Sequence, residues 1–364
     1  ISRRPKKELT KSGRQRLVIK ADAKFTTEIS ALSHMLLDPI ATKLRHEWKD
    51  KRLVIVAPGA LEYLPFAALP LPSENYYQPL IASHEVVNLP SASVLAALRR
   101  ETAGRQPAAK TLAVIADPVF ELNDPRALAA KRKGSRDNLV ANVQSADEAP
   151  ADVVITAGSD LARAAKSFNR AGFSRLPFSS EEAGTIADLV PKNSLLKATG
   201  FRANHAMAAS GALARYRIVH FATHGLINSQ HPELSGLVLS LVDENGKPQD
   251  GFLRMHEISN LEMPADLVVL SACQTALGKE IKGEGLVGLT RGFMYAGAER
   301  VVASLWQVDD EATSQLMGYF YHGMLKEGLR PAAALRAAQI EMSRNSRWSA
   351  PYYWAGFVIQ GEWR

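Results

Sequence analysis

The sequence predicts an α/β protein with a mainly parallel sheet, and three observations support this fold class. Short, almost continuously apolar runs are typical of strands buried on both faces. These runs alternate with stretches of helical periodicity, the order that produces parallel strands joined by helices. Turn signals such as Pro-Gly at 58–59, Asp-Pro at 117–118 and Asn-Gly at 245–246 separate the segments.

The first part of the chain begins with helical periodicity and continues with short apolar runs. Apolar residues at helical spacing predict a helix over 26–48, and "KRLVIVAPG" predicts a strand over 51–59. A strand that continues into a helix is expected over 84–100, and "TLAVIADP" indicates a strand over 111–118. Residues 119–175 are polar, alanine-rich and weakly periodic, so we interpret them as an insertion that is partly disordered.

Residues 176–364 alternate regularly between strand and helix signals. Strands are expected at 216–225, 266–275, 299–310 and 351–361. Helices are expected at 179–190, 283–298, 311–328 and 330–344, and a hairpin leading into a helix at 233–258. Ser180 is a candidate cap for the first of these helices.

Length and composition exclude several classes of protein. A chain of 364 residues, 46% hydrophobic and 22% charged, is an ordinary globular chain long enough for about two domains or lobes. The single cysteine excludes intrachain disulfides and zinc fingers and fits a reducing compartment. No apolar run reaches the roughly 18 residues that a membrane helix needs, and the given sequence does not start with a signal-peptide pattern. Since the chain begins at Ile1, we expect it to be part of a longer protein.

The formal net charge of +7 is concentrated at the beginning of the chain. Residues 1–24 hold nine Lys or Arg and two Asp or Glu, so the other 340 residues are neutral on balance. Such a basic arm is able to bind nucleic acid or an acidic partner, and it is equally well explained as a solvated boundary segment. Because no zinc-finger or RNA-recognition signature is present, any nucleic-acid binding is expected through residues 1–24 alone.

Two of the predicted strands end in residues with catalytic chemistry. In an open α/β sheet, ligands bind outside the carboxyl ends of the strands. "RIVHFATHG" ends in His224 and Gly225, and "DLVVLSACQT" brings Cys273. If these strands are parallel neighbours, His224 and Cys273 lie at one edge of the sheet. The general alternative for an isolated cysteine is a core thiol that packs as a small hydrophobe.

A histidine beside a cysteine suits the hydrolysis of peptide bonds. An imidazole lowers the pKa of a nearby thiol, and it protonates a leaving amine. Gly225 has no Cβ, so its backbone N–H and that of Cys273 are candidates for an oxyanion hole. His224 precedes Cys273 by 49 residues, and caspases place a histidine about 50 residues before an alanine-cysteine signature. We therefore predict that His224 and Cys273 form a catalytic pair that needs no acidic third member.

Four segments together resemble the CHAT domain: "EYLPFAAL", "HFATHG", "LSACQT" and "GEGLVGLTRGFMYAGAERVVASLWQVDD". The resemblance covers residues 50–118 and 176–361. It implies a caspase-like, separase-related cysteine peptidase in which His224 is the catalytic histidine and Cys273 the nucleophile. The implied fold is a three-layer α/β/α sandwich with a mainly parallel sheet, preceded by a smaller, non-catalytic caspase-like lobe.

These considerations divide the chain into four parts. They are a basic arm with a helix (1–50), the smaller caspase-like lobe (51–118), the insertion (119–175) and the catalytic domain (176–364). Bacterial CHAT proteins often carry tetratricopeptide repeats. This chain contains none, so the resemblance places such a module upstream.

The same resemblance assigns a substrate pocket. In separase-like relatives, a Trp-x-Val-x-Asp segment lines the pocket for the side chain before the cut. The corresponding candidates in "SLWQVDD" are Ser304, Trp306, Asp309 and Asp310. An acidic pocket favours Arg or Lys in the substrate. The alternative is that Asp309 or Asp310 caps the helix that follows, and one residue is able to fill both roles.

Three further features bear on function. His220 and His224 lie four residues apart, but no third ligand has metal spacing, so no metal is expected. Glu284, in the glycine-rich "KGEG", is a candidate for a switch loop over 278–284, and a plain loop role is the alternative. "KRKGSR" (131–136) is an exposed basic loop or a self-cleavage site.

The function predicted from these residues is a cytoplasmic cysteine endopeptidase acting on a protein substrate, with a basic residue before the cut. The resemblance implies activation by a regulatory protein partner or an upstream module, in bacterial antiviral defence or cell death. No cofactor and no membrane partner are expected. The alternative is a catalytically silent caspase-like scaffold, which the presence of both His224 and Cys273 disfavours.

Overall fold

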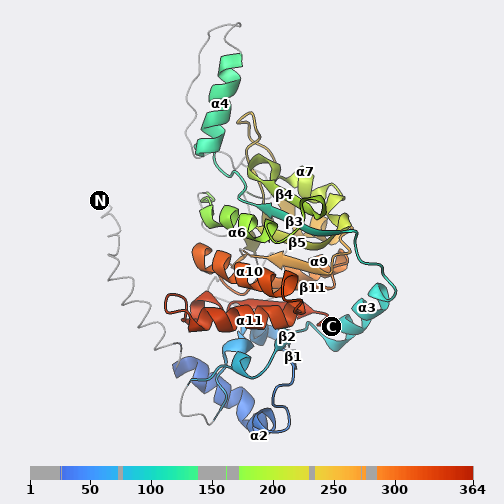
Figure 1. Cartoon of the computed structure of the whole chain (residues 1–364), viewed down its shortest axis with the longest axis vertical. Helices are drawn as coiled ribbons and strands as arrows, with labels where there is room; N and C mark the ends of the chain where they lie inside the picture. Colours follow the sequence, from blue (N-terminus) through green and yellow to red (C-terminus); the bar gives the residue numbers. More distant parts are fainter. Residues whose placement is uncertain are drawn as a thin grey trace, which may run out of the picture.

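The computed structural model describes residues 25, 27–72, 77–137, 161, 172–228, 234–271, 273–275 and 285–363 (Figure 1). For residues 132–137, 273–275 and 285–287 this description extends to the backbone only. The predicted basic arm over 1–24, the switch loop with Glu284 and most of the predicted insertion lie outside the described residues.

The central feature of the fold is an eight-stranded sheet with the order β1-β2-β12-β11-β9-β5-β3-β4. All neighbouring pairs are parallel except β11 with β12. The strands are β1 (Leu53–Ile55), β2 (Val86–Asn88), β3 (Lys110–Ala116), β4 (Leu195–Thr199), β5 (Tyr216–Ala222), β9 (Leu267–Leu270), β11 (Arg300–Ser304) and β12 (Phe357–Gly361). The prediction of an α/β fold with a mainly parallel sheet is therefore confirmed.

A smaller sheet with the order β10-β6-β7-β8 continues from the carboxyl ends of the central strands. Its strands are β6 (Gly225–Ile227), β7 (Gly236–Val238), β8 (Phe252–Arg254) and β10 (Cys273–Thr275). Strands β6 and β10 are parallel, whereas β7 is antiparallel to both β6 and β8. Gly236 is required in β7, because a Cβ there would lie 2.3 Å from the backbone oxygen of Leu253.

The helices are distributed over both faces of the central sheet. They are α2 (Ala41–Arg45), α3 (Ala92–Thr102), α4 (Pro125–Asp137), α6 (Pro177–Ala187), α7 (His205–Ala209), α8 (Met255–Ser259), α9 (Gly285–Tyr295), α10 (Asp310–Leu325) and α11 (Pro331–Arg344). Single turns of 3-10 helix are η1 (Asp38–Ile40), η2 (Gly59–Tyr63), η3 (Phe66–Ala68), η4 (Leu80–Ala82), η5 (Lys192–Ser194), η6 (Gly200–Arg202), η7 (Ala212–Arg215) and η9 (Pro351–Tyr353).

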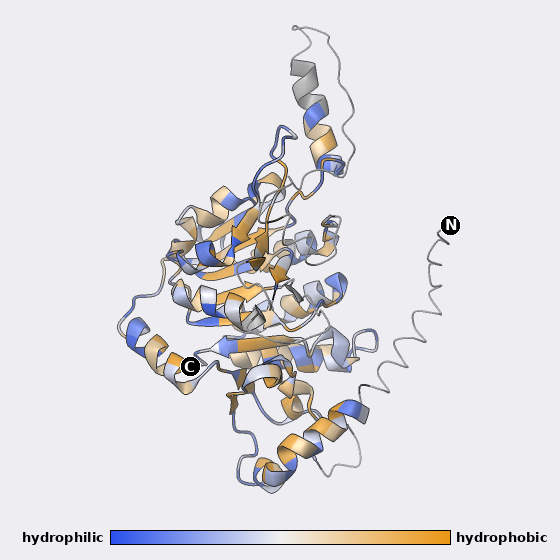
Figure 2. Cartoon of the chain, turned by 180° about the vertical axis from the view of Figure 1, so that it is seen from behind, coloured by the Kyte–Doolittle hydropathy of each residue, from blue (hydrophilic) through white to orange (hydrophobic). Residues whose placement is uncertain are grey.

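Alternate residues of the central strands enter two separate cores. Val114 of β3 and Val269 of β9 pack with α6, α10 and α11, which lie together on one face (Figure 1). Ile115 and Val268, the adjacent residues, pack on the opposite face with α8 and α9. This alternation follows from the two-residue period of a strand. It explains why the strands are largely apolar on both faces and form the hydrophobic centre of the molecule (Figure 2).

Several predicted boundaries differ from the observed ones. Pro39 interrupts the helix expected over 26–48, so helical residues at 27–37 are followed by η1 and the short helix α2. Ser180 lies inside α6 and does not cap it, because the helix already begins at Pro177. The expected strand over 299–310 is shorter, since β11 ends at Ser304 and α10 begins at Asp310.

Strand β3 has a position in the sheet that sequence order does not suggest. It precedes the predicted insertion but lies between β4 and β5, which follow that insertion. Strands from both sides of residues 119–175 thus belong to one sheet, and the division of the chain into four parts stays a prediction. Helix α4 belongs to the predicted insertion and projects from one end of the molecule (Figure 1).

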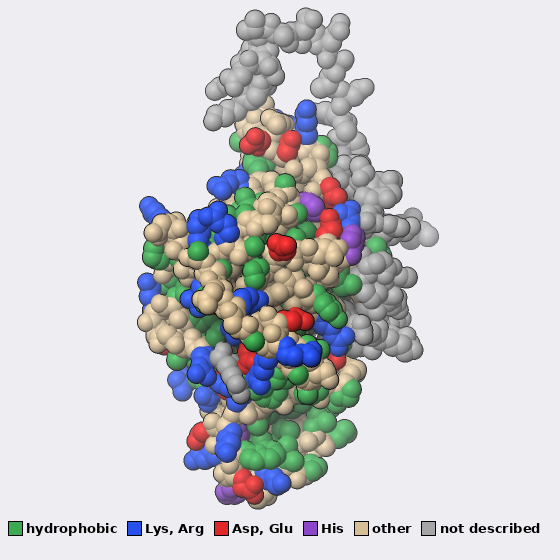
Figure 3. Space-filling view, turned by 90° about the vertical axis from the view of Figure 1, so that its right-hand side faces the viewer, with side chains coloured by type: hydrophobic (Ala, Val, Ile, Leu, Met, Phe, Trp, Pro, Cys, Tyr) green, Lys and Arg blue, Asp and Glu red, His purple; other side chains and the backbone are tan. Residues whose placement is uncertain are grey.

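The surface carries charges of both signs. On the face shown in Figure 3, Lys and Arg side chains are interspersed with Asp, Glu and apolar ones. This agrees with the balanced charge of the sequence after residue 24. Within the described ranges, no helix is long and apolar enough to cross a bilayer.

Candidate active site

The candidate site lies where two parallel central strands pass into the smaller sheet. Strand β5 pairs in parallel with β9, and beyond them β6 pairs in parallel with β10. The strands expected over 216–225 and 266–275 are therefore each divided in two at this point. Cys273 is the cross-strand partner of Gly225, the residue that follows His224. The condition that the two strands are parallel neighbours is met.

The backbone around His224 is held on both sides. The Val238 N–H of β7 donates to the His224 carbonyl oxygen at 2.8 Å. On the neighbouring strand, the Ser271 N–H donates to the carbonyl oxygen of Phe221 in β5 at 3.0 Å. The first bond ties His224 to the smaller sheet, and the second joins β5 to the residue after β9, so both fix the backbone from which the His224 side chain extends.

The His224 ring is 1% exposed and is surrounded by two aromatic side chains. Its centroid lies 5.0 Å from that of Phe120 and 5.7 Å from that of Phe173. Its Nε2 lies 2.7 Å from the carbonyl oxygen of Ser174. A carbonyl oxygen only accepts hydrogen bonds, so Nε2 carries the proton and Nδ1 is the acceptor nitrogen of the neutral ring. A general base needs such an acceptor nitrogen.

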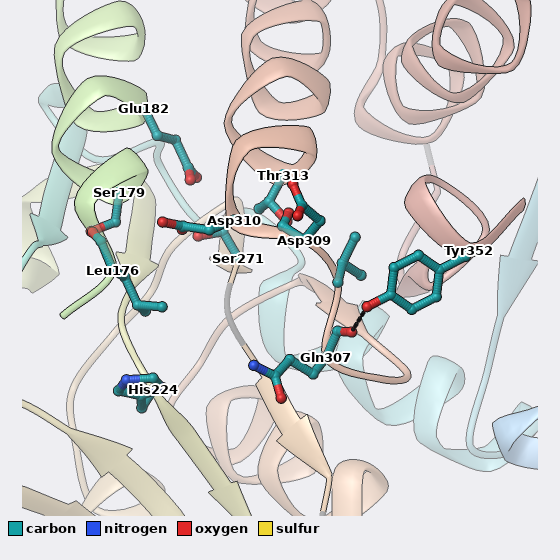
Figure 4. Close-up of a pocket in the computed structure, with 11 residues that line it drawn as sticks. Leu176, Ser179, Glu182, His224, Ser271, Gln307, Asp309, Asp310, Thr313 and Tyr352 are labelled. Atoms are coloured by element: carbon teal, nitrogen blue, oxygen red, sulfur yellow. Dashed lines mark hydrogen bonds between the residues drawn. The ribbon is translucent and has the colours of Figure 1, made fainter. Parts of the chain in front are cut away.

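A cavity of about 270 Å³ extends from His224 to the beginnings of α6 and α10. Its lining combines one histidine, three carboxylates and several neutral side chains: Leu176, Ser179, Glu182, His224, Ser271, Gln307, Val308, Asp309, Asp310, Thr313 and Tyr352. The Tyr352 hydroxyl donates to the Gln307 carbonyl oxygen at 3.0 Å and ties one wall together (Figure 4).

The part of the cavity between α6 and α10 is acidic. The carboxyl groups of Glu182 and Asp310 extend into this space from the two helices (Figure 4). The Phe178 N–H, in the first turn of α6, donates to Asp310 Oδ2 at 3.0 Å. Burial raises the pKa of Asp310 to about 6. The Phe178 hydrogen bond opposes this rise, and the charges of Glu182, Asp309 and Asp117 add to it.

Glu182 contacts a buried histidine, which in turn contacts a buried tyrosine. Its Oε1 lies 2.7 Å from His220 Nε2, and His220 Nδ1 lies 2.9 Å from the hydroxyl of Tyr321. The Glu182 and His220 atoms are close but are not aligned for a hydrogen bond. All three side chains are at most 1% exposed. Burial and the charge of Glu182 together raise the pKa of Tyr321 well above its ordinary value.

The four residues expected to form the substrate pocket have different environments. Asp309 and Asp310 line the cavity, and Asp309 is also the N-cap of α10, where it accepts from the Ala312 N–H at 3.0 Å. Asp309 therefore caps the helix, whereas its role in a substrate pocket stays a prediction. Ser304 and Trp306 do not line the cavity. The Ser304 hydroxyl donates to the Trp306 carbonyl, and the Trp306 indole donates to the Tyr352 carbonyl at 3.0 Å.

Sequence reasoning missed three residues around the cavity. Glu182 is one of two adjacent glutamates in α6, and only the packing of the helix determines which one faces inward. Ser174 contributes a carbonyl group, which leaves no signal in a sequence. Asp117 was interpreted as a turn residue, although its left-handed backbone and burial to 4% exposure mark an unusual position.

The described part of the chain contains no cluster of His, Cys, Asp and Glu suited to a metal ion. His220 and His224 have separate environments, His220 against Tyr321 and His224 against Phe120 and Phe173. The backbone of Cys273 is placed by its pairing with Gly225, whereas its side chain lies outside the described atoms.

Comparison with known proteins identifies the family. Residues 26–362 match the CHAT domain. The chain belongs to the CHAT domain family. This confirms the resemblance drawn from "HFATHG", "LSACQT" and the segments around them.

Two curated proteins are similar to this domain over half of its length. Tetratricopeptide repeat protein 28 from Homo sapiens is 28% identical over 217 residues, which are 51% of this chain and 8% of that protein. Its counterpart from Mus musculus is 30% identical over 220 residues, again 51% of this chain and 8% of that protein. The similarity therefore covers a small part of the longer relatives.

Two solved structures resemble the CHAT domain at low sequence identity. Separase in the Saccharomyces cerevisiae separase–securin complex matches with a TM-score of 0.45 and 13% identity, covering 85% of this chain and 16% of that one. The Arg-specific cysteine proteinase gingipain R matches with a TM-score of 0.39 and 9% identity, covering 77% of this chain and 54% of that one.

Proposed function

We propose that this CHAT domain is a cysteine endopeptidase with Cys273 as nucleophile and His224 as general acid and base. One observation carries the proposal: Cys273 pairs across the strands with Gly225, directly after the buried His224, whose ring lines a cavity of about 270 Å³. A histidine and a cysteine at the carboxyl ends of neighbouring parallel strands suit nucleophilic attack on a peptide carbonyl.

The proposed reaction uses each group in turn. The Cys273 thiolate forms a bond to the carbonyl carbon, and the backbone N–H groups of Gly225 and Cys273 stabilise the oxyanion. The C–N bond then breaks as the leaving nitrogen takes a proton from the His224 imidazolium. Water attacks the thioester, His224 takes its proton, and the C–S bond breaks to release the acid and the thiol. The Nε2 contact with Ser174 leaves Nδ1 as the nitrogen that exchanges protons.

The acidic part of the cavity supports a preference for a basic side chain before the cut. Glu182 and Asp310 approach this space from two helices, so a guanidinium between them would contact a carboxylate on either side. Asp309 adds a third negative charge at the wall. Because Asp310 titrates near pH 6, cleavage after arginine should weaken as the pH falls below 6.

The decisive experiment compares Cys273→Ala and wild type on a library of Arg-, Lys-, Asp- and Met-containing peptides, with cut sites mapped by mass spectrometry. Cleavage after basic residues that disappears in the variant is expected. Cleavage that survives Cys273→Ala contradicts the mechanism. Binding of a protein without any cleavage by wild type favours the alternative function, a catalytically silent scaffold. Loss of cleavage after arginine in Asp310→Asn, with alkylation of Cys273 by iodoacetamide unchanged, tests the pocket separately.

Regulation by other proteins is part of the same proposal. The curated relatives are named for tetratricopeptide repeats, and the chain spans about 8% of their length. We infer that an upstream repeat module or a separate partner controls the peptidase, in a setting such as bacterial defence or cell death. The test is the rate of peptide cleavage by the domain alone and by the full-length protein. Equal rates contradict control by the upstream part.

A further inference from the structure

A short segment over 172–176 covers His224 and is attached to the end of β3. Phe173 is 1% exposed and packs against the His224 ring, and the Ser174 carbonyl oxygen lies 2.7 Å from His224 Nε2. The next residue, Arg175, donates from Nε to Asp117 Oδ1 at 2.9 Å and from Nη2 to Oδ2 at 2.8 Å. The two contacts on His224 are therefore followed directly by a bidentate ion pair.

Asp117 is a well-anchored partner for this arginine. It directly follows β3, is 4% exposed and has a φ of 48°, a left-handed conformation that few residues other than glycine adopt. A second arginine, Arg126, donates to the Asp117 carbonyl oxygen at 2.9 Å, and its Nη1 also lies 2.9 Å from Oδ2. Such strained residues persist only where the surrounding contacts determine their conformation.

Arg126 is itself held in place. Its guanidinium donates to Asp124 Oδ1 and Oδ2 at 2.9 and 2.7 Å. Burial opposes the charged form of Asp124, but its contacts with Arg126 outweigh burial and lower the pKa of Asp124. The hydrogen bond from Arg175 to Asp117, partly offset by desolvation, raises the pKa of Arg175 above its ordinary value. Asp117 is therefore contacted from two directions, by Arg175 and by Arg126.

The ion pair between Arg175 and Asp117 acts on the orientation of the Ser174 carbonyl group, which the aromatic contacts do not determine. Phe173 and Phe120 pack on the His224 ring and exclude water. Apolar contact is non-directional, so it does not determine which ring nitrogen carries the proton. A hydrogen bond to the Ser174 carbonyl oxygen is directional, and it selects the ring form with the proton on Nε2. A bidentate arginine one residue away restricts both the position and the rotation of that peptide group.

We propose that Arg175 and Asp117 are positioning residues for His224: their ion pair holds the Ser174 carbonyl against Nε2 and thereby keeps Nδ1 as the proton-accepting nitrogen. The consequence for catalysis rests on the proposed peptidase function, whereas the consequence for the ring itself does not. A histidine that loses its orienting partner divides between two ring forms, and only one of them presents its acceptor nitrogen to the substrate.

The experiment reads the ring of His224 directly. Ring ¹⁵N chemical shifts of the labelled protein distinguish the two tautomers, and the His224 signals are identified by their loss in His224→Gln. Arg175→Met and Arg175→Lys are compared with wild type. Methionine removes the charge and both hydrogen bonds. Lysine keeps the charge but lacks the planar guanidinium that donates two parallel hydrogen bonds. Because the Arg175 side chain is 44% exposed, these variants should fold.

Arg99→Met is the matched control. Arg99 also forms a bidentate pair, with Nε 2.6 Å and Nη2 3.2 Å from the carboxylate of Glu362, and its side chain is 35% exposed. It lies on α3, outside the cavity lining. A change that follows from the loss of any arginine–carboxylate pair would appear in this control as well.

The expected result is a single Nε2–H tautomer in wild type and Arg99→Met, and a mixture in Arg175→Met. Arg175→Lys should lie between them. Cleavage by Arg175→Met should fall on the order of tenfold to hundredfold, mostly in kcat, as is typical when the orienting partner of a functional histidine is removed. An unchanged tautomer in Arg175→Met overturns the proposal, as does a wild-type ring with the proton on Nδ1. A ring that responds to Arg175 in a protein without cleavage refutes the peptidase function alone.

Discussion

Replacing Asp310 by asparagine should stabilise the folded chain near neutral pH, although it removes a charge from the cavity. Burial raises the pKa of Asp310 to about 6, against an ordinary value of 3.8. The folded chain therefore binds this proton more tightly than the unfolded chain does. Folding stability decreases as the pH rises from about 4 to about 6, and the cost is fully present above 6. Asparagine has no such charge, and its amide oxygen still accepts from the Phe178 N–H.

The size of the effect follows from the difference between the two pKa values. A difference of about two pH units corresponds to about 3 kcal/mol, since each unit is worth 1.36 kcal/mol. Asp310 is only partly buried, so solvent screens part of the interaction and we expect about 1–2 kcal/mol at pH 7.5. At pH 4 the wild-type carboxyl group is mostly protonated when folded, and the difference should nearly vanish.

Urea unfolding of wild type and Asp310→Asn at pH 4 and pH 7.5 measures this difference. Glu311→Gln is the control, because Glu311 is the next residue on α10 but forms an ion pair with Arg347 outside the cavity. Loss of that surface pair should cost no more than about 1 kcal/mol and bring no gain. Asp310→Asn that is less stable than wild type at pH 7.5, or equally shifted at both pH values, would refute the reasoning.

Two further substitutions, each compared with a control variant, test the packing on either side of the site. Tyr321→Phe removes the hydroxyl 2.9 Å from His220 Nδ1 and should cost about 1–3 kcal/mol in unfolding free energy, because a buried polar atom loses its partner. Tyr295→Phe, at an 82% exposed side chain, should change it by less than about 0.5 kcal/mol, and equal losses in the two variants would contradict the role of the buried bond. Gly236→Ala should prevent the β7–β8 pairing and destabilise the chain, since its Cβ would meet the Leu253 oxygen at 2.3 Å. A variant as stable as wild type would contradict the need for glycine at this position. Gly184→Ala, inside α6 with 3.8 Å to the nearest atom, should instead leave stability unchanged or raise it by up to about 1 kcal/mol.

The positions of the elements could be predicted because they depend on local patterns. Runs such as "RIVHFA" and "DLVVL" are mostly apolar, and the structure has β5 and β9 there. The cap at Asp309 and the start of α11 at Pro331 were likewise visible, since capping depends on neighbouring residues alone. The break at Pro39 likewise depends on a local signal, because proline interrupts a helix.

The candidate site could be predicted only in part. Because parallel strands end at the same edge, the sequence was sufficient to expect His224 and Cys273 near each other, and the register of Cys273 with Gly225 agrees with this. The inward face of α6, which brings Glu182 toward Asp310, depends on how that helix packs on α10. No local pattern distinguishes Glu182 from its neighbour Glu181.

The sequence by itself determined the fold class, the family and the candidate pair His224 and Cys273, because periodicity and short motifs are properties of adjacent residues. Only the tertiary structure decided that β3 lies between β4 and β5, that Glu182 faces Asp310, and that Ser174 and Arg175 connect His224 to Asp117. The contacts of Ser174 with His224 and of Arg175 with Asp117 join residues 50 and 58 positions apart. They arise when separate elements pack against one sheet, and backbone groups such as the Ser174 carbonyl carry no side-chain identity that a sequence could reveal.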